Sequence, residues 1–196
     1  MKIFPRTSAE RGFSMIELMT VISIMIVLAG ILIGALPGIQ AKVNRGKVET
    51  LMAELKSGLS KYQLEHGIYP QNPPNGGDRD SIGVEGSKVL YRYLSGDWGP
   101  GESPDGEVDD EETIYVPKLS YFQNKDSKDP RSEKIADDYY IVDAYGNPIR
   151  YLAEPPNIKS SERETYNPTY DLWSIVDADP SNEEDQARHI TNWQSN

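Results

Sequence analysis

The first third of the chain contains a long run of apolar residues with one charged residue at its start. From Leu18 to Ala41 the sequence has 24 consecutive positions without Asp, Glu, Lys or Arg. A helix needs about 20 residues to cross the hydrocarbon core of a bilayer, so this run predicts a membrane-spanning helix. Glu17 lies directly before it, although a carboxylate at the centre of a membrane helix costs about 2.5–3.5 kcal/mol on insertion scales.

Beyond residue 42 the apolar positions recur at intervals of three and four residues. This stripe is typical of an amphipathic helix with one buried face, and it comprises Val43, Val48, Leu51, Met52, Leu55, Leu59 and Tyr62. Gly67 is placed to end the helix, and Pro70 follows it. The pattern therefore predicts one helix from about Phe13 to His66, with a break at residues 36–38, where a proline and a glycine follow Leu36.

The C-terminal half shows strand patterns separated by turn residues. Residues 138–142 (DYYIV) and 149–152 flank the turn sequence of residues 143–148, which predicts a β-hairpin. Residues 169–176 (TYDLWSIV) alternate in character and predict a third strand. Three antiparallel strands packed on the amphipathic helix give an α+β fold, with a long N-terminal helix on a small sheet.

The middle of the chain is dominated by loop residues. Residues 86–94 favour a short helix, and residues 115–122 favour an irregular strand or loop. Residues 96–112 are rich in Gly, Pro and acidic residues, which predicts a solvated loop that does not build the core.

Charge is distributed unevenly along the chain. The first 50 residues contain 6 Lys and Arg against 3 acidic residues, whereas the remaining residues contain 14 against 28. A basic start before an acidic domain is typical of a protein anchored at a membrane by its N-terminus. The net charge of −11 argues against a nucleic-acid partner, and the lack of cysteine excludes disulfides and thiolate sites. Neither of the 2 histidines lies in a catalytic pattern, so we expect no enzyme activity.

The apolar run has three interpretations on the residues alone. A secretory signal peptide normally has an h-region of about 7–15 residues and a small-residue cleavage site, and this run is longer and lacks a clear site. A plain signal anchor fits the length but leaves Glu17 unexplained. The third interpretation is a helix with a function of its own besides anchoring.

The residues around Glu17 favour the third interpretation, because Gly12, Phe13 and Glu17 followed by an apolar run resemble the class III leader of type IV pilins and type II secretion pseudopilins. The resemblance implies that a prepilin peptidase cuts between Gly12 and Phe13 and methylates the new amino group of Phe13. The expected parts are then a leader at 1–12, a transmembrane and filament-core helix at 13–40, its amphipathic continuation at 41–66 and an extracytoplasmic domain at 67–196.

The resemblance also implies an assembly role for Glu17. After cleavage Phe13 carries an α-amino group with an ordinary pKa of about 7.7–8.0, and Phe13 and Glu17 lie four residues apart on one helical face. The carboxylate of Glu17 can pair with its own amine or with that of a neighbouring subunit, and such a partner offsets much of the cost of burying a charge. The alternative is a glutamate that extends to water at the membrane interface.

Three further stretches resemble the type II secretion major pseudopilins in particular. They are residues 143–151 (DAYGNPIRY), residues 171–174 (DLWS) and the pair Asn192-Trp193. The resemblance implies a periplasmic pseudopilus subunit in the bacterial inner membrane, with a cytoplasmic leader. Its partners would be copies of itself, other pseudopilins, the prepilin peptidase and the inner-membrane secretion assembly. A type IV pilin-like fibre subunit and a membrane-anchored binding module that does not polymerise remain alternatives.

That subgroup binds Ca²⁺ in the loop after the Ser strand, and the resemblance implies a similar site here. Hard cations such as Ca²⁺ take 6–8 oxygen ligands, and we expect Asp177, Asp179 and Asp185 to supply side chains, with Ile175 or Ser174 adding a carbonyl or hydroxyl. The family pattern Ser-x-Gly-x-Asp-Gly reads SIVDADP from Ser174 onward. Which aspartate takes the ligand position is therefore open, and a solvated acidic loop is the alternative.

Overall fold

The structure, a computed structural model, describes residues 12–74, 77–98, 103–110, 112–178 and 183–193. It consists of two compact units, Met1–Lys42 and Val43–Asn196. The expected leader lies outside the described residues except for Gly12. The helices are α1 (Met15–His66), α2 (Arg79–Leu94) and α3 (Tyr121–Asn124), and the 3₁₀ helices are η1 (Ser160–Glu162) and η2 (Glu183–Arg188). The strands are β1 (Ser132–Ile135), β2 (Asp138–Ile141), β3 (Arg150–Ala153), β4 (Tyr170–Ser174) and β5 (Ile190–Thr191).

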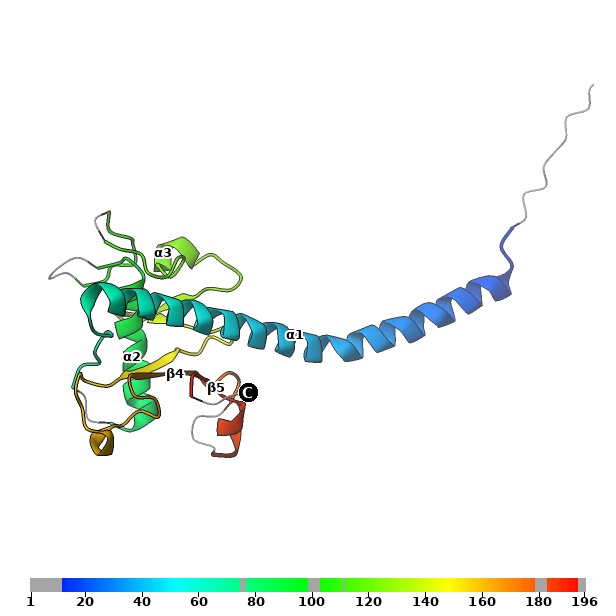
Figure 1. Cartoon of the computed structure of the whole chain (residues 1–196). Coiled ribbons are helices and arrows are strands. Elements are labelled where there is room, and N and C mark those ends of the chain that lie inside the picture. Colours follow the sequence, from blue (N-terminus) through cyan, green and yellow to red (C-terminus); the bar gives the residue numbers. More distant parts are fainter. Residues whose placement is uncertain (1–11, 75–76, 99–102, 111, 179–182, 194–196) are drawn as a thin grey trace, which may run out of the picture. The chain divides into compact units, whose positions relative to one another are not determined.

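The long helix α1 begins and ends close to the predicted positions (Figure 1). Gly67 ends it with a φ of 80° and donates its N–H to the carbonyl of Gln63 at 2.8 Å. The predicted break at residues 36–38 is wrong, because the helix runs through Pro37. A proline removes a single N–H donor from the helix, and the hydrogen bonds of the turns on either side are enough to continue it.

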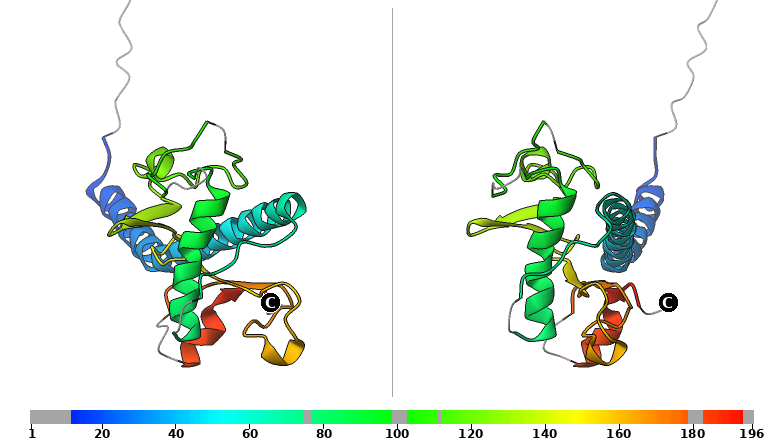
Figure 2. Two further views of the ribbon diagram at one scale, coloured as in Figure 1. Left: turned by 90° about the vertical axis from the view of Figure 1, so that its left-hand side faces the viewer. Right: turned by 60° about the vertical axis from the view of Figure 1, so that its left-hand side comes forward.

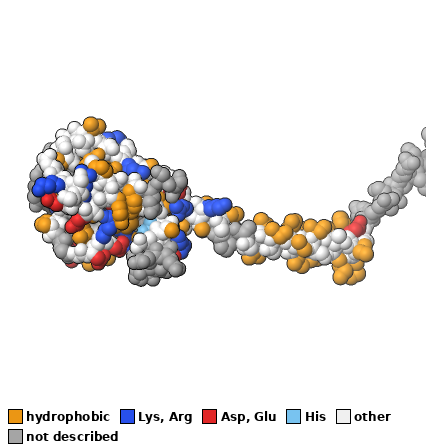
Figure 3. Space-filling view, turned by 60° about the horizontal axis from the view of Figure 1, so that its bottom comes forward, with side chains coloured by type: hydrophobic (Ala, Val, Ile, Leu, Met, Phe, Trp, Pro, Cys, Tyr) orange, Lys and Arg blue, Asp and Glu red, His pale blue; other side chains and the backbone are white. Residues whose placement is uncertain are grey.

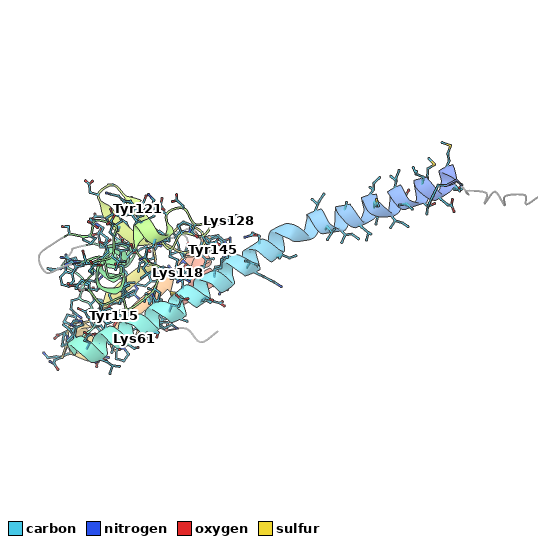
Figure 4. The ribbon with its side chains drawn as sticks, turned by 90° about the horizontal axis from the view of Figure 1, so that it is seen from above. Lys61, Tyr115, Lys118, Tyr121, Lys128 and Tyr145 are labelled. Atoms are coloured by element: carbon cyan, nitrogen blue, oxygen red, sulfur yellow. The ribbon has the colours of Figure 1, made fainter. Side chains whose placement is uncertain are left out.

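Within the second unit, α1 buries most of the predicted stripe, although its first member, Val43, is 45% exposed. Its fully or almost fully buried members are Val48, Leu51, Met52, Leu55 and Leu59, and they belong to one core with residues of α2, β2, β3 and β4. Gly58 allows a close approach, because a Cβ built there would lie 2.3 Å from Cγ2 of Val116. Figure 4 shows Tyr115 and Lys118, which belong to the same chain segment as Val116, alongside α1.

The helix α2 is longer than predicted at its N-terminal end. The side chain of Asp78 accepts hydrogen bonds from the backbone N–H groups of Asp80 and Ser81 and so starts the helix at Arg79. α2 contacts both β2 and β3 (Figure 2). At Gly86 an added Cβ would lie 1.9 Å from the carbonyl oxygen of Tyr151, so this contact requires glycine.

The strands form two sheets rather than one, which corrects the predicted hairpin. β2 pairs with β1, while β3, β4 and β5 form a three-stranded antiparallel sheet. The predicted hairpin persists at its inner end, where Val142 forms a bridge with Pro148, the N–H of Ile149 donates to the carbonyl of Ile141 and the N–H of Asp143 donates to the carbonyl of Asn147. The hydroxyl of Ser87 on α2 accepts from the N–H of Ile141 at 3.0 Å and donates to its carbonyl at 2.9 Å. The N–H of Ile141 therefore bonds to the helix rather than to the second strand of the predicted hairpin.

The acidic loop at residues 96–112 contributes to the core, contrary to the prediction. Asp97 is only 1% exposed and accepts hydrogen bonds from the hydroxyl of Tyr91, the N–H of Asp105 at 3.0 Å and the N–H of Gly106 at 2.8 Å. Burial raises the pKa of this carboxyl group above its ordinary value. The buried carboxylate of Asp97 therefore orders the described part of this loop through its hydrogen bonds.

Candidate functional sites: the N-terminal segment and the C-terminal loop

The N-terminal segment is organised by a reciprocal pair of hydrogen bonds between Ser14 and Glu17. The N–H of Ser14 donates to Oε2 of Glu17 at 2.9 Å, and the N–H of Glu17 donates to Oγ of Ser14 at 3.3 Å. This arrangement is a capping box, which satisfies two N–H groups that the start of a helix leaves without partners. The spacing of Ser14 and Glu17 is visible in the sequence, but the charge of Glu17 alone does not indicate this capping role.

The helix in the first unit presents apolar side chains on all sides. Phe13 is 80% exposed and Met15 is 87% exposed, and hydrophobic side chains lie along the described part of this segment on the face that Figure 3 shows. Among the described residues, α1 is the one helix long and apolar enough to cross a membrane. The hydroxyls of Thr20 and Ser23 donate to the carbonyls of Ile16 and Met19 at 2.7 and 2.8 Å, so these polar groups are satisfied within the helix.

The turn after β2 and the end of β4 form one hydrogen-bonded network around Asp143. Its carboxylate accepts from the N–H of Tyr145 at 2.9 Å, from the N–H of Asn147 at 3.0 Å and from the hydroxyl of Ser174 at 2.5 Å. Asp143 is 3% exposed, and burial raises its pKa. Two of the stretches that carried the family resemblance are thus parts of one buried structural unit.

A second network, here called the Arg79 clasp, joins the start of α2 to the end of the chain. The guanidinium of Arg79 lies 4.5 Å from the ring of Tyr166, 4.8 Å from that of Trp173 and 5.3 Å from that of Trp193. Arg79 also forms an ion pair with the fully buried carboxylate of Asp171. The sequence indicated Asp171, Trp173 and Trp193 through the resemblance, but not their common partner Arg79.

The side chain of Asn192 binds the tail to the sheet. Its Oδ1 accepts from the N–H of Leu172 at 2.9 Å, and its Nδ2 donates to the carbonyl of Tyr170 at 3.2 Å. An amide side chain that both accepts and donates can extend a strand ladder beyond the last backbone pair. The Asn192-Trp193 pair therefore holds the C-terminal residues against β4 through the side chain of Asn192.

The loop after β4 holds the residues expected to bind Ca²⁺. Asp177 and Asp185 both face Arg188, with separations of 2.5 and 3.4 Å from its guanidinium nitrogens. Asp179 lies outside the described residues, and among the described residues no group of three acidic or histidine side chains is arranged to hold a metal ion. The contacts neither test nor complete the expected site, so calcium binding stays a prediction.

The remaining two expected ligands have hydrogen-bond partners within the protein. The hydroxyl of Ser174 donates to Asp143 and accepts from the N–H of Val176 at 3.0 Å. The carbonyl of Ile175 accepts from the N–H of Ala178 at 2.9 Å. The carbonyl oxygen of Ile175 and the hydroxyl oxygen of Ser174 each have two lone pairs and each accept one hydrogen bond, so each retains one lone pair that can face an ion.

The backbone at Val176 bears on the register of the loop. Val176 has a φ of 58°, a left-handed conformation that glycine adopts readily and a β-branched residue adopts rarely. When the pattern Ser-x-Gly-x-Asp-Gly is aligned at Ser174, Val176 stands at its first glycine, so this conformation favours the unshifted alignment, and the ligand positions stay a prediction. Ala178, which carries no ligand atom in its side chain, then occupies the position of the pattern's aspartate.

Comparison with known proteins finds that part of the sequence is similar to pilins and to secretion-system proteins. The chain is 40% identical over 83 residues to the type IV major pilin protein PilE1 of Neisseria gonorrhoeae, which is 41% of this chain and 37% of the relative. It is 39% identical over 83 residues to a fimbrial protein of Neisseria meningitidis serogroup A, 41% of this chain and 47% of the relative. It is 38% identical over 65 residues to the type II secretion system core protein G of Klebsiella michiganensis, 33% of this chain and 46% of the relative.

These matches confirm the resemblance to type IV pilins and to type II secretion core protein G. The chain spans less than half the length of each of these relatives. No family model matches the chain, and no solved structure matches it. None of the relatives' names is that of an enzyme, in agreement with the expectation that this chain is not one.

Proposed function

We propose that this protein is a structural subunit of a periplasmic pseudopilus of a type II protein secretion system, which polymerises through its N-terminal helix. The observation that carries the proposal is the contrast within α1. Its first part, up to Lys42, leaves its apolar side chains exposed, whereas the part after Val43 buries a stripe in a well-packed unit. An apolar surface of this extent requires a membrane or other protein to cover it. The similarity to core protein G supports a secretion pseudopilus as the assembly.

A type IV pilin-like fibre subunit is the second candidate, because two of the relatives described above are a type IV pilin and a fimbrial protein. Both candidates share anchoring, leader cleavage and polymerisation, and they differ in the machine that builds the fibre. Deleting the gene in the native host separates them. Loss of an exported enzyme from the medium supports the secretion role, whereas loss of surface fibres with export intact supports the pilin role. A membrane-anchored module that does not polymerise predicts neither loss.

The processing step follows from the residues around Gly12. We propose cleavage between Gly12 and Phe13 by a prepilin peptidase and methylation of the new N-terminus. The intact mass and N-terminal sequence of the protein from its native membranes should show a chain that begins at N-methylated Phe13. Gly12→Leu is the matched variant for the cleavage site. No atom lies within 4 Å of a Cβ added there, so an effect of this variant on cleavage has no steric origin in this structure. A chain that begins at Met1 or far beyond Phe13 contradicts the proposal.

The role of Glu17 in assembly is separated from its role in capping by three variants. Ser14→Ala removes one bond of the capping box and keeps the charge, which costs about 1 kcal/mol of helix stability. Glu17→Gln keeps an acceptor for the N–H of Ser14 and removes the charge. Glu17→Ala removes both. If Glu17 pairs with a neighbour's amine, Glu17→Gln and Glu17→Ala should both leave processed monomers in the membrane, while Ser14→Ala still assembles. Normal fibres from Glu17→Gln would remove the pairing role and leave capping as the explanation.

A further inference from the structure

A cavity of about 310 Å³ lies between the end of α1 and the loop that connects β3 to β4. The end of α1 and the residues after it contribute Gln63 and Ile68 to its lining, and the loop contributes Ile158 and Arg163. The cavity belongs wholly to the second unit and includes no residue of the candidate sites described above. Its volume is at the lower limit of pockets that hold small organic molecules.

Arg163 in this lining is an arginine without a partner in the protein. Its Nε atom is buried and forms no hydrogen bond. Among the described residues no carboxylate forms an ion pair with its guanidinium, whereas Arg79, Arg131 and Arg150 each pair with an aspartate or a glutamate. Buried polar atoms in native structures normally have hydrogen-bond partners, and a charged group that lacks one costs free energy. This arrangement suits an anion that comes from outside the chain.

Glu154 lines the same cavity, but its carboxylate is engaged in ordering the loop. Its Oε1 atom accepts from the N–H of Glu164 at 2.6 Å, from the N–H of Thr165 at 2.7 Å and from the hydroxyl of Thr165 at 2.9 Å. These bonds hold the backbone directly after Arg163 and so fix the part of the loop that carries the guanidinium. The charge of Glu154 would repel a dianion such as a phosphate monoester more strongly than a single carboxylate.

We propose that this cavity binds a carboxylate that is attached to a small apolar group. The planar guanidinium of Arg163 can donate two parallel hydrogen bonds to a carboxylate, which is the geometry that arginine favours. The rest of the lining offers apolar contact, because Ile68, which is 43% exposed, and Ile158 lie in it together with Pro155, Pro156 and Pro168. The proposal concerns the second unit alone and holds whichever assembly the protein belongs to.

The test is a nuclear magnetic resonance titration of the full-length chain in detergent with N-acetyl-leucine. The Nε–H signal of Arg163, identified by its loss in Arg163→Gln, should shift and saturate. N-acetyl-leucinamide, which lacks the charge, and acetate, which lacks the apolar group, should each bind at least about tenfold more weakly. The backbone N–H signal of Ile68 measures binding in the variants as well as in the wild type.

Arg163→Gln should lower the affinity for N-acetyl-leucine at least about tenfold, since it removes the charged donor. Arg163→Lys keeps the charge without the planar fork and should lie between the two. Lys159→Gln is the matched control, because it removes a positive charge from the same loop at a side chain that is 79% exposed and does not line the cavity. It should bind as the wild type does.

A carboxylate of this kind can belong to a free acid or to a side chain within a protein, and a second probe separates the two sources. Acetyl-Leu-Glu-Leu-amide carries its carboxylate on a side chain, so tighter binding of this peptide assigns the cavity to an acidic segment of a protein. Tighter binding of N-acetyl-leucine assigns it to a free terminal carboxylate.

Three results overturn the proposal. They are a signal of Arg163 that does not saturate with either carboxylate, equal binding of N-acetyl-leucine and its amide, and an affinity of Arg163→Gln equal to that of the wild type. If Arg163→Gln does not fold, the Arg163 signal is identified from Arg163→Lys, and the order of the probes on the wild type still decides.

Discussion

The two parts of α1 have the same secondary structure but opposite relations to their surroundings. Before Lys42 the helix is apolar on every side and its described side chains are exposed, as Met15 and Ile33 are at 87% and 69%. After Val43 the helix is apolar on one side, and that side is buried, as Leu55 and Leu59 are at 0%. A helix that is apolar all round is normally buried in a membrane or a protein core. The second part therefore packs against other elements of the chain, whereas the first part requires a membrane or another protein to cover it.

The largest expected effect comes from a matched pair of leucines, one in each part of α1. Leu59→Ala should lower the free energy of unfolding of the second unit by about 2–5 kcal/mol, because it leaves a cavity in a packed core. Leu28→Ala, at a position that is 55% exposed, should change it by less than about 0.5 kcal/mol. Urea unfolding followed by tryptophan fluorescence measures this, since all 3 tryptophans belong to the second unit. Equal losses would show that the two parts do not differ in this way.

The second largest effect on the free energy of unfolding is expected from the Arg79 clasp, which belongs entirely to the second unit. Asp171→Asn should lower the free energy of unfolding by about 3 kcal/mol, because Arg79 then lacks its charge partner among three aromatic rings. Lys159→Met is the control, since its ion pair with Glu162 joins side chains that are 79% and 57% exposed and should contribute less than about 1 kcal/mol. Chemical denaturation measures the free energy of unfolding of both variants. An Asp171→Asn protein as stable as the Lys159→Met control would contradict a stabilising role of the Arg79 clasp.

Two glycines of α1 make a finer comparison within the same helix. Gly58→Ala should destabilise the second unit by about 1–3 kcal/mol, because the new methyl group overlaps the side chain of Val116. Gly46→Ala meets no atom within 4 Å and should stabilise the helix by about 0.5–1 kcal/mol through its better helix propensity. Thermal unfolding of the two variants should therefore shift in opposite directions. A shift in the same direction would place the packed face of α1 elsewhere.

The effect expected to be smallest near neutral pH concerns buried tyrosine hydroxyls, which occur in the packed unit. Burial raises the pKa of Tyr170 from its ordinary value of 10.0 to about 12. Between these values the unfolded chain binds fewer protons than the folded one, so the free energy of unfolding falls as the pH rises. Tyr170→Phe removes this titration and should reduce the slope by up to about 1.4 kcal/mol per pH unit. Urea unfolding at pH 8, 10, 11 and 12 measures the slope, and identical slopes for variant and wild type refute the expectation.

The parts of the fold that depend on periodicity could be predicted from the sequence. The two patterns of α1 and its end at Gly67 follow from residue spacing, and the structure confirms them. The short extent of the predicted hairpin could not be predicted, because the N–H of Ile141 donates to Ser87, which lies 54 residues away in the chain. The helix α1 also continues through Pro37, since one missing donor does not end a long helix.

The residue types of the candidate sites could be predicted from the sequence, but their tertiary partners could not. Residue types indicated Glu17 and the acidic C-terminal loop, but they did not reveal which side chains oppose those charges. Arg79 and Arg188 are single basic residues in an unremarkable local context, and their roles arise from tertiary contacts with Asp171 and Asp177. Calcium binding stays a prediction, because one expected ligand, Asp179, lies outside the described residues.

The most direct test of the central claim is cysteine cross-linking of the first part of α1 in native membranes. The chain contains no cysteine, so cysteine pairs introduced at exposed positions such as Leu18, Leu28 and Ile33 are the sole thiols. If copies of this helix cover one another, oxidation should give covalent oligomers larger than dimers for at least one pair, and the Gly12→Leu background should abolish them. Monomers alone from every pair, in a chain that is correctly processed to Phe13, would contradict the account.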